Sequence, residues 1–350
     1  MKNKLIPTKN KKVIPKNILK KFYTEDPEQL LKKELEKKFG SRYTKYRDNY
    51  LAILDDDEHK INTQYPTTVV LELLNRCDLE CVMCYQGFRN NAEKFTVDEN
   101  MLDKIFADFK KNKLSALMLT ASEPLLYKHF DKVLKRAEEA EIMDVFIFTN
   151  GNLLNEKNTK LILNSCVTRL FVSIDAATEE TYNKIRVPVS KRLLEKSRLE
   201  RLENNVKNFV KMKKDLNKKL PLTRVSFVAL SENSHEVDLF KEKWENIVDS
   251  VEIQRETSIK VYDKIKNYRG KKLDNYNCTK PWGDMAIYSN GLVGPCCNLV
   301  GRKTPIGNIK NNSITEIWNG EKMTELRNGF KNNNPNDVCK SCIESQELNL

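Results

Sequence analysis

Six short runs rich in β-branched residues alternate with longer amphipathic stretches between about residues 67 and 255. The runs cover residues 67–74, 115–120, 143–149, 168–174, 223–230 and 250–254, and the helix-period stretches cover 99–112, 127–141, 155–165, 199–219 and 235–248. This alternation is typical of β-α units that build a parallel sheet. Because six units are too few to close an eight-stranded barrel, we predict an α/β fold with a partial (β/α)6 barrel.

The flanks of this region have a different character. Residues 1–65 read as a basic tail followed by a helical extension, with helix patterns at PEQLLKKELEKKF and SRYTKYRDNYLAIL. We expect the extension to pack against the barrel or the substrate entrance. After residue 256 the β-α rhythm stops, and residues 271–350 are rich in Asn, Gly and Cys. We therefore divide the chain into an extension (1–65), a barrel (66–256) and a small domain (257–350) held by metal.

Composition excludes several classes of protein. No stretch approaches the roughly 18 apolar residues of a membrane span, and the N-terminus lacks the apolar run of a secretory signal. We expect a cytoplasmic protein with no membrane partner. Residues 1–21 carry eight Lys and no acid, which leaves +4 of the net charge of +12 for the rest of the chain. The charge therefore reflects a solvated tail, and we expect no nucleic-acid partner.

Three of the nine cysteines follow the first predicted strand with the spacing C-x3-C-x2-C: Cys77, Cys81 and Cys84. In a reducing compartment such a group is typical of metal ligands rather than disulfides. Three thiolates can hold a four-iron four-sulfur cluster and leave one iron open to a small molecule. A zinc site short of one ligand and three incidental buried thiols are the alternatives, and no His lies close in sequence to complete a zinc site.

The position and spacing of this group resemble the radical S-adenosylmethionine (SAM) superfamily. Residues 120–125, TASEPL, stand where that family has a Gly-Gly-Glu-Pro-like motif at the end of the second strand, with Ala121 and Ser122 in place of the glycines. The resemblance implies that Glu123 grips the ammonium group of SAM. It also implies an iron-sulfur cluster on Cys77, Cys81 and Cys84.

Further family positions follow in order at the ends of later strands. The third strand ends in Thr149-Asn150-Gly151 and the fourth in Ser173-Ile-Asp175, with Arg186 shortly after. Met83 stands where the family usually has an aromatic residue against adenine, and Tyr85 follows it. The resemblance thus implies a SAM site built from Met83, Tyr85, Thr120, Ser122, Glu123, Asn150, Ser173, Asp175 and Arg186.

A second group of cysteines lies about 200 residues later. Two alternating runs flank Asn290-Gly291, which is a strong hairpin signal between Cys278 and Cys296, and the chain then carries a short helix at 314–318 and the pair Cys339-x2-Cys342. A zinc ribbon stays open on spacing alone. The pattern resembles the SPASM/twitch domain, which implies an auxiliary 4Fe-4S cluster on Cys278, Cys296, Cys339 and Cys342, in the one-cluster form.

Two cysteines remain. Cys166 precedes a strand and is interpreted as a packed core residue. Cys297 points away from Cys296 by strand alternation. It is a packed residue, a competing ligand or a hydrogen-atom donor to the substrate.

The resemblance implies an enzyme that cleaves SAM reductively to a 5'-deoxyadenosyl radical and abstracts a hydrogen atom from its substrate, with an electron donor such as flavodoxin or ferredoxin. If the auxiliary cluster takes up the second electron, the expected reaction is dehydrogenation of a sugar, cyclitol or polyol alcohol. The alternatives are a radical epimerase of a sugar or peptide with a Cys donor and, from another class, a zinc-bearing nucleic-acid-binding protein. Candidate substrate residues are Glu252, Arg255 and Asp284.

Overall fold

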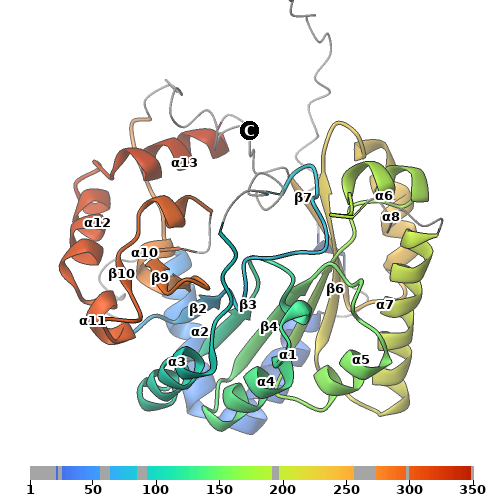
Figure 1. Cartoon of the computed structure of the whole chain (residues 1–350), viewed down its shortest axis with the longest axis horizontal. Coiled ribbons are helices and arrows are strands. Elements are labelled where there is room, and N and C mark those ends of the chain that lie inside the picture. Colours follow the sequence, from blue (N-terminus) through green and yellow to red (C-terminus); the bar gives the residue numbers. More distant parts are fainter. Residues whose placement is uncertain are drawn as a thin grey trace, which may run out of the picture.

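Figure 1 presents the computed structural model, which describes residues 21–22, 26–55, 64–84, 93–190, 197–255, 273–296 and 299–347. One mixed sheet runs through the molecule in the order β1-β7-β6-β5-β4-β3-β2-β8-β9-β10. Its six central strands are parallel: β2 (Thr68–Leu71), β3 (Ala116–Leu119), β4 (Asp144–Thr149), β5 (Arg169–Ser173), β6 (Leu222–Ala229) and β7 (Ser250–Arg255). All six lie where the sequence predicted strands, and the partial barrel is confirmed.

Helices cover the outer face of this sheet. They are α3 (Glu99–Asn112), α4 (Phe130–Glu139), α5 (Glu156–Leu163), α6 (Glu179–Ile185), α7 (Arg198–Asp215) and α8 (Val237–Trp244), with short 3-10 turns η3 (Pro124–Leu126) and η5 (Ser234–Glu236). The charged stretch that precedes β6 forms α7, whose Leu202, Val206 and Phe209 are fully buried against the barrel. Burial of this apolar stripe explains why a helix with so many charges stays docked.

The strands present alternate residues to two faces. Outward residues such as Val145 and Val172 join the helices in one core. In β3 to β7, every half-buried residue except Arg255 lies on the inward face: Met118, Phe148, Ser173, Arg224, Val228, Glu252 and Gln254. The inward face is therefore the part of the sheet that small molecules can reach.

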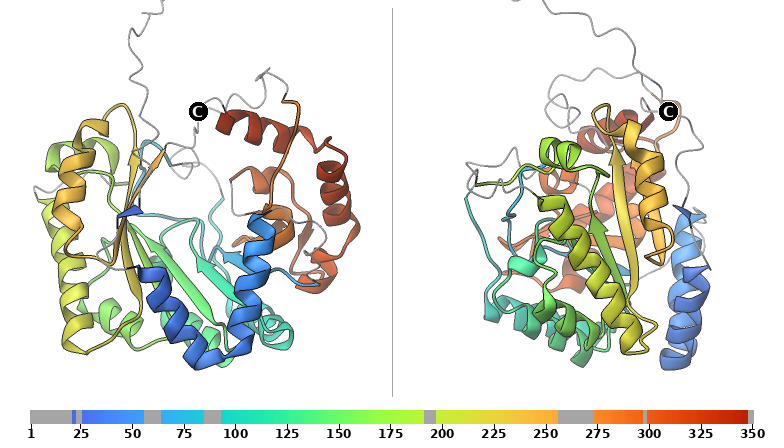
Figure 2. Two further views of the ribbon diagram at one scale, coloured as in Figure 1. Left: turned by 180° about the vertical axis from the view of Figure 1, so that it is seen from behind. Right: turned by 90° about the vertical axis from the view of Figure 1, so that its right-hand side faces the viewer.

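The N-terminal extension forms α1 (Pro27–Phe39) and α2 (Ser41–Leu54), the two predicted helices, and β1 (Lys21–Phe22) pairs with β7. Tyr43 and Tyr46 pack with Ala116 and Met143, which lie at the amino ends of β3 and β4. Of the two placements that the sequence left open, the helices thus take the one against the barrel, at the end opposite the cysteine loop (Figure 2).

The C-terminal segment continues the same sheet. It contains α10 (Lys280–Gly283), β8 (Asp284–Ile287), β9 (Leu292–Gly294), η6 (Leu299–Lys303), β10 (Gly307–Asn308), α11 (Ile314–Trp318), α12 (Glu321–Lys331) and α13 (Asp337–Glu347). Strand β8 pairs in parallel with β2, and β8 and β9 form the predicted hairpin, in which Gly291 adopts φ +90°. Figure 1 shows this segment along one flank of the barrel. The boundary predicted at residues 256 and 257 lies outside the described residues.

Candidate active site

The first cysteine group lies in the loop after β2, at the carboxyl end of the barrel. Cys81 is buried, while Cys77 and Cys84 are half-buried, and the Cys84 N–H donates to the Cys81 carbonyl at 2.9 Å. Cys77 and Cys84 both lie close enough to Cys81 to interact with it electrostatically. Burial raises the pKa of Cys81 to about 11, and the neighbouring Arg186 guanidinium opposes this shift. The loop thus gathers three thiols that are buried or half-buried.

Glu123 lies beside the cysteine loop and links the segments that follow β3 and β4. Its carboxylate accepts hydrogen bonds from Thr149 Oγ1 (2.8 Å), the Asn150 N–H (2.8 Å) and the Leu125 N–H (3.1 Å), and the residue is 1% exposed. Burial raises the pKa of Glu123 to about 7, although the Asn150 and Thr149 donors pull it down and Asp78 adds to the rise. Glu123 therefore holds the ends of β3 and β4 together.

Asn150 connects the third strand to the cysteine loop. Its side-chain amide donates to Asp78 Oδ1 at 2.6 Å and to Cys77 Sγ at 3.7 Å, and Asn152 donates to Asp78 Oδ2 at 2.8 Å. Asp78 was missed by sequence reasoning. The sequence offers one indication of its role: Asp78 directly follows the first predicted ligand cysteine. An acidic side chain there can accept hydrogen bonds from the side-chain amides that follow β4.

The segment 120–125, in which Ala121 and Ser122 replace the family's two glycines, keeps a backbone conformation that favours glycine. Ala121 adopts φ +75°, in the left-handed region that costs an L-residue roughly 1–2 kcal/mol. Ser122 Oγ donates to the Leu74 carbonyl and ties the motif to the start of the cysteine loop. Thr120 lies at the end of β3 and is half-buried. The loop thus holds its shape although both glycines are absent.

The fourth strand ends beside the same loop. Ser173 is half-buried at the end of β5, whereas Asp175 is fully buried with φ +63° and forms an ion pair with Arg186. Arg186 Nη1 also donates to Cys81 Sγ at 3.4 Å. Met83 is half-buried in the cysteine loop. Tyr85 and Cys297 lie outside the described residues.

The second cysteine group lies in the C-terminal segment. Cys278, Cys339 and Cys342 lie near one another, and burial, followed by the two neighbouring thiols, raises the pKa of Cys339 to about 12. Cys296 follows β9 and packs on Gly301, where a Cβ would come within 3.1 Å of the Cys296 sulfur. The described contacts therefore bring three of the four predicted ligands together, with Cys296 on the neighbouring hairpin.

Both groups offer sulfur donors alone, which is the donor set of iron-sulfur clusters. None of the eight described cysteines forms a disulfide. Within the described part of the chain, no three His, Cys, Asp or Glu side chains lie close enough to share a single metal ion. The chemistry of the donors thus fits clusters held by thiolates.

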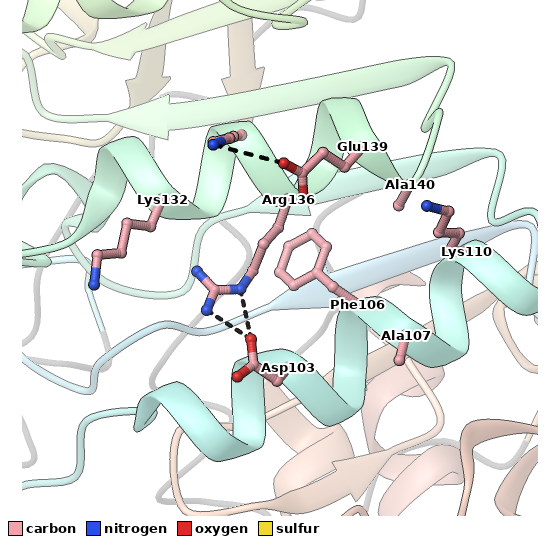
Figure 3. Close-up of a pocket in the computed structure, with 9 residues that line it drawn as sticks. Asp103, Phe106, Ala107, Lys110, Lys132, Arg136, Glu139 and Ala140 are labelled. Atoms are coloured by element: carbon pink, nitrogen blue, oxygen red, sulfur yellow. Dashed lines mark hydrogen bonds and ion pairs between the residues drawn. The ribbon is translucent and has the colours of Figure 1, made fainter.

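A groove of about 530 Å³ lies elsewhere, on the outside of the barrel between α3 and α4 (Figure 3). Its lining is charged, and Arg136 pairs with Asp103 across it at 2.6 Å. Lys132 pairs with Glu99 at 2.9 Å at its rim. None of the predicted site residues lines this groove, so it is separate from the site at the carboxyl ends of the strands.

Two family models match the chain. Residues 71–220 match the radical SAM superfamily, and residues 278–343 match SPASM, an iron-sulfur cluster-binding domain. These families imply 4Fe-4S clusters and SAM as cofactors. Their matches do not support the alternative of a zinc-bearing nucleic-acid-binding protein.

Curated relatives include proteins named probable GTP 3',8-cyclase. Those of Methanococcus maripaludis and Methanocaldococcus jannaschii are each 26% identical, over 33% and 47% of this chain. The matches span 39% and 50% of those relatives, so the chain spans half of their length or less. The protein of that name from Methanococcus vannielii is 24% identical, and the match spans 68% of this chain and 88% of that relative.

Solved structures share the fold. BtrN in complex with AdoMet and 2-DOIA is 17% identical, covers 78% of this chain and 91% of that one, and has a TM-score of 0.51. Native anSMEcpe with bound AdoMet is 15% identical, covers 80% of this chain and 96% of that one, and has a TM-score of 0.56. SuiB of Streptococcus suis bound to the precursor peptide SuiA is 17% identical, covers 78% of this chain and 69% of that one, and has a TM-score of 0.56.

No described helix has the length and apolar character needed to cross a membrane.

The site geometry and the comparisons point to the same family. The evidence comprises three thiols beside a buried carboxylate at the carboxyl ends of the strands, a second thiol group and both family matches. The chain belongs to the radical SAM superfamily and is a radical SAM enzyme with a C-terminal SPASM iron-sulfur cluster-binding domain.

Proposed function

We propose that this enzyme dehydrogenates an alcohol group of a sugar, cyclitol or polyol. Cys77, Cys81 and Cys84 would hold the SAM-binding 4Fe-4S cluster. The auxiliary cluster, in the one-cluster twitch form, would use Cys278, Cys296, Cys339 and Cys342. When bound, these groups and SAM supply a radical that removes a hydrogen atom from an unactivated carbon and an acceptor for the second electron.

The observation that carries the proposal is the direct pairing of β8 with β2. Val70 lies opposite Ala286 in this parallel pair, so the strand before the first cysteine loop and the first strand of the hairpin that leads to Cys296 are neighbours. The first thiol group and Cys296 of the second therefore follow strands of one continuous sheet. This arrangement supports an auxiliary cluster that serves the same substrate pocket, as an oxidation of the substrate radical requires.

The inward face of the sheet supports a polyhydroxylated substrate. Phe148 and Phe171 contact each other there with centroids 4.7 Å apart, which gives one wall an aromatic surface. The strands next to it are polar: Arg224 stacks on the Phe171 ring at 3.5 Å and pairs with Glu252 Oε2 at 2.5 Å, and Gln254 donates to the same oxygen at 3.1 Å. Aromatic rings beside hydrogen-bonding groups suit a sugar or cyclitol ring.

The charge of this face argues against a triphosphate substrate such as that of the GTP 3',8-cyclases. Arg224 is neutralised by Glu252, and Arg302 of η6 is paired with Glu72. A nucleotide triphosphate needs an excess of cations. Arg224 on the inward face and Arg302 of the C-terminal segment each have a carboxylate partner, which favours an uncharged substrate.

Glu252 is the residue that we propose as proton acceptor. Oxidation of an alcohol releases the hydroxyl proton, and a carboxylate within hydrogen-bond reach is a suitable base. Glu252 is half-buried on the inward face, and Arg224 and Gln254 both contact its Oε2. Of the other candidates, Asp284 pairs with Lys280 at the amino end of β8, and Arg255 lies on the outward face of β7, so neither supports this role.

The epimerase alternative requires a thiol at the substrate. Cys166 precedes β5, at the amino end of the barrel, and its thiol contacts the Leu134 carbonyl at 3.6 Å. This position is at the far end of the strand from the proposed pocket, so Cys166 is a packed residue. Cys297 stays the candidate donor of this alternative.

The remaining parts of the proposal concern the setting. The 1-electron reduction of the first cluster calls for a flavodoxin or ferredoxin as donor. Cysteines without disulfides, as at the eight described positions, suit the reducing cytoplasm that we propose as its location.

The test begins with anaerobic reconstitution and iron analysis, for which about eight irons per chain are expected. The enzyme is then incubated with SAM, reductant and a panel of C-deuterated hexoses, inositols and GTP. Dehydrogenation predicts deuterium in 5'-deoxyadenosine and a product three mass units lighter than the deuterated substrate, because one deuterium and the hydroxyl proton are lost. A product only one mass unit lighter, with solvent hydrogen in place of the deuterium, would favour the epimerase, and turnover of GTP alone would refute the sugar assignment.

Variants of the polar wall refine this test. Glu252→Gln keeps the size of the side chain but removes the base, so product formation should fall by about 10²–10⁴-fold while SAM cleavage continues. The same change at Glu200, which is exposed on α7, is the control and should leave product formation unaltered.

A further inference from the structure

The cysteine loop is paired with the segment that follows α6. Three backbone hydrogen bonds join residues 78–82 to residues 185–189: Glu80 N to Val187 O (2.7 Å), Val82 N to Ile185 O (3.0 Å) and Val189 N to Asp78 O (3.0 Å). Cys81 and Arg186 are thus held opposite each other by the main chain. Their contact does not depend on a freely rotating side chain alone.

The Arg186 side chain is fixed at both ends of its guanidinium group. Nη1 donates to Cys81 Sγ at 3.4 Å, and Nη2 forms an ion pair with Asp175. Arg186 is 8% exposed and Asp175 is fully buried. A planar guanidinium that is held by a carboxylate on one side presents its other N–H groups in a set direction.

Asp175 is itself fixed by its surroundings. The Val228 N–H donates to Asp175 Oδ1 at 2.7 Å, and Asn233 Nδ2 donates to the Asp175 carbonyl at 2.8 Å. Its positive φ of 63° is uncommon for a residue other than glycine and persists where neighbours determine it. Asp175, Arg186 and Cys81 are therefore joined in the buried interior by an ion pair and a hydrogen bond that are already formed in this structure.

A donor aimed at a ligand sulfur acts on the cluster that this sulfur would hold. Reduction adds negative charge to a cluster, and hydrogen bonds to its sulfurs are among the factors that set its potential. A buried cation interacts more strongly than one in water because the local dielectric is low. Arg186 should therefore stabilise the reduced form more than the oxidised form.

We propose that Arg186 is a positioning residue for the first cluster: it donates to the Cys81 sulfur and raises the reduction potential of the cluster. This inference rests on the proposed assignment of Cys77, Cys81 and Cys84 as cluster ligands. It concerns the contact with Cys81, so it holds in the absence of SAM. It adds a role to the SAM contact that the family resemblance implies for this residue.

The test is a redox titration of the reconstituted enzyme without SAM, followed by electron paramagnetic resonance. Arg186→Gln should make the first cluster at least tenfold harder to reduce, which is about 59 mV for a one-electron couple. Arg186→Lys keeps the charge but not the fork and should give a smaller shift in the same direction. The second cluster serves as an internal reference and should keep its potential.

Arg169→Gln is the matched control. Arg169 is also a buried arginine in an ion pair, with Asp144 at 3.3 Å, but it lies at the amino end of the barrel. Its loss should lower stability and leave both potentials unchanged. Because the same charge is removed from a similar environment, this control separates a local effect on the cluster from general destabilisation.

The outcomes separate this inference from the proposed function. If the native chain binds no iron through the three cysteines, the ligand assignment itself fails. If it binds a cluster but the potential is unchanged in every Arg186 variant that retains four irons at this site, the inference about Arg186 is wrong. If Arg186→Gln alone loses its iron while Arg169→Gln keeps it, contact with the ligand is supported, and the lysine variant then supplies the potential.

Discussion

The Glu72 carboxylate, fully buried directly after β2, forms an ion pair with Arg302 of the C-terminal segment. The same carboxylate accepts hydrogen bonds from the N–H (3.0 Å) and the hydroxyl (2.9 Å) of Ser289. Arg302 in turn stacks on the Tyr288 ring at 3.9 Å. One acidic residue of the barrel thus anchors the hairpin that leads to Cys296.

Glu72→Gln should therefore destabilise the protein strongly. The change leaves the half-buried Arg302 without its counter-charge, and loss of one partner of a buried pair costs about 3–5 kcal/mol. Urea unfolding under anaerobic conditions measures this free energy. Glu156→Gln is the control, since the Glu156 and Lys160 side chains of its ion pair are 70% and 60% exposed and the pair should contribute far less to stability. Equal losses in the two variants would contradict an anchoring role for Glu72.

Ala121→Gly should stabilise the protein. Ala121 is strained at φ +75°, and glycine removes this strain, so that even after its larger entropy loss on folding a gain of about 0.5–1 kcal/mol is expected. The control is Ala107→Gly, at an exposed position within α3, which should cost about 0.5–1 kcal/mol. Opposite signs in thermal unfolding support the assignment, and a loss in both variants would refute it.

Much of the fold was predictable because it is encoded locally. The helix patterns in the extension correspond to α1 (Pro27–Phe39) and α2 (Ser41–Leu54), and the run predicted at 143–149 contains β4 (Asp144–Thr149). Apolar periodicity within ten or twenty residues suffices for such elements. The Asn290-Gly291 signal likewise predicted the hairpin of β8 and β9.

The long-range contacts were not predictable in the same way. A hairpin signal identifies the antiparallel partner of β8 but contains no information on β2, which pairs with its other edge. The hydrogen bond between Arg186 and Cys81 joins residues 105 positions apart and depends on the pairing of two loops. Such contacts follow from the assembled barrel, which is why the motifs predicted Arg186 as a site residue but not its partner.

Glu123 should make stability depend on pH. Its pKa in the folded protein is raised by burial to about 7, so its contribution to stability is fully present below about 4.5 and is lost as pH rises through 7. Relative to wild type, Glu123→Gln should become more stable by up to about 3 kcal/mol between pH 4.5 and 8, since one unit of pKa shift is about 1.4 kcal/mol.

Urea midpoints at several pH values, measured without SAM, test this dependence on Glu123. The control is Glu200→Gln on the exposed surface of α7, which should run parallel to wild type. Parallel curves for Glu123→Gln and wild type would show that the carboxylate is ionised throughout this range and that its three hydrogen-bond donors outweigh its burial.

Cys339→Ser should remove the auxiliary cluster and keep the first one. Cys339 lies beside Cys278 and Cys342, away from the cysteine loop after β2, so iron should fall from about eight to about four per chain. SAM cleavage should persist while formation of the oxidised product stops, because the second electron has no acceptor. Cys166→Ser is the control and should keep its iron, since the Cys166 thiol contacts the Leu134 carbonyl at the other end of the barrel. Oxidised product from the four-iron variant would show that another acceptor takes the electron and that the C-terminal thiols have a structural role.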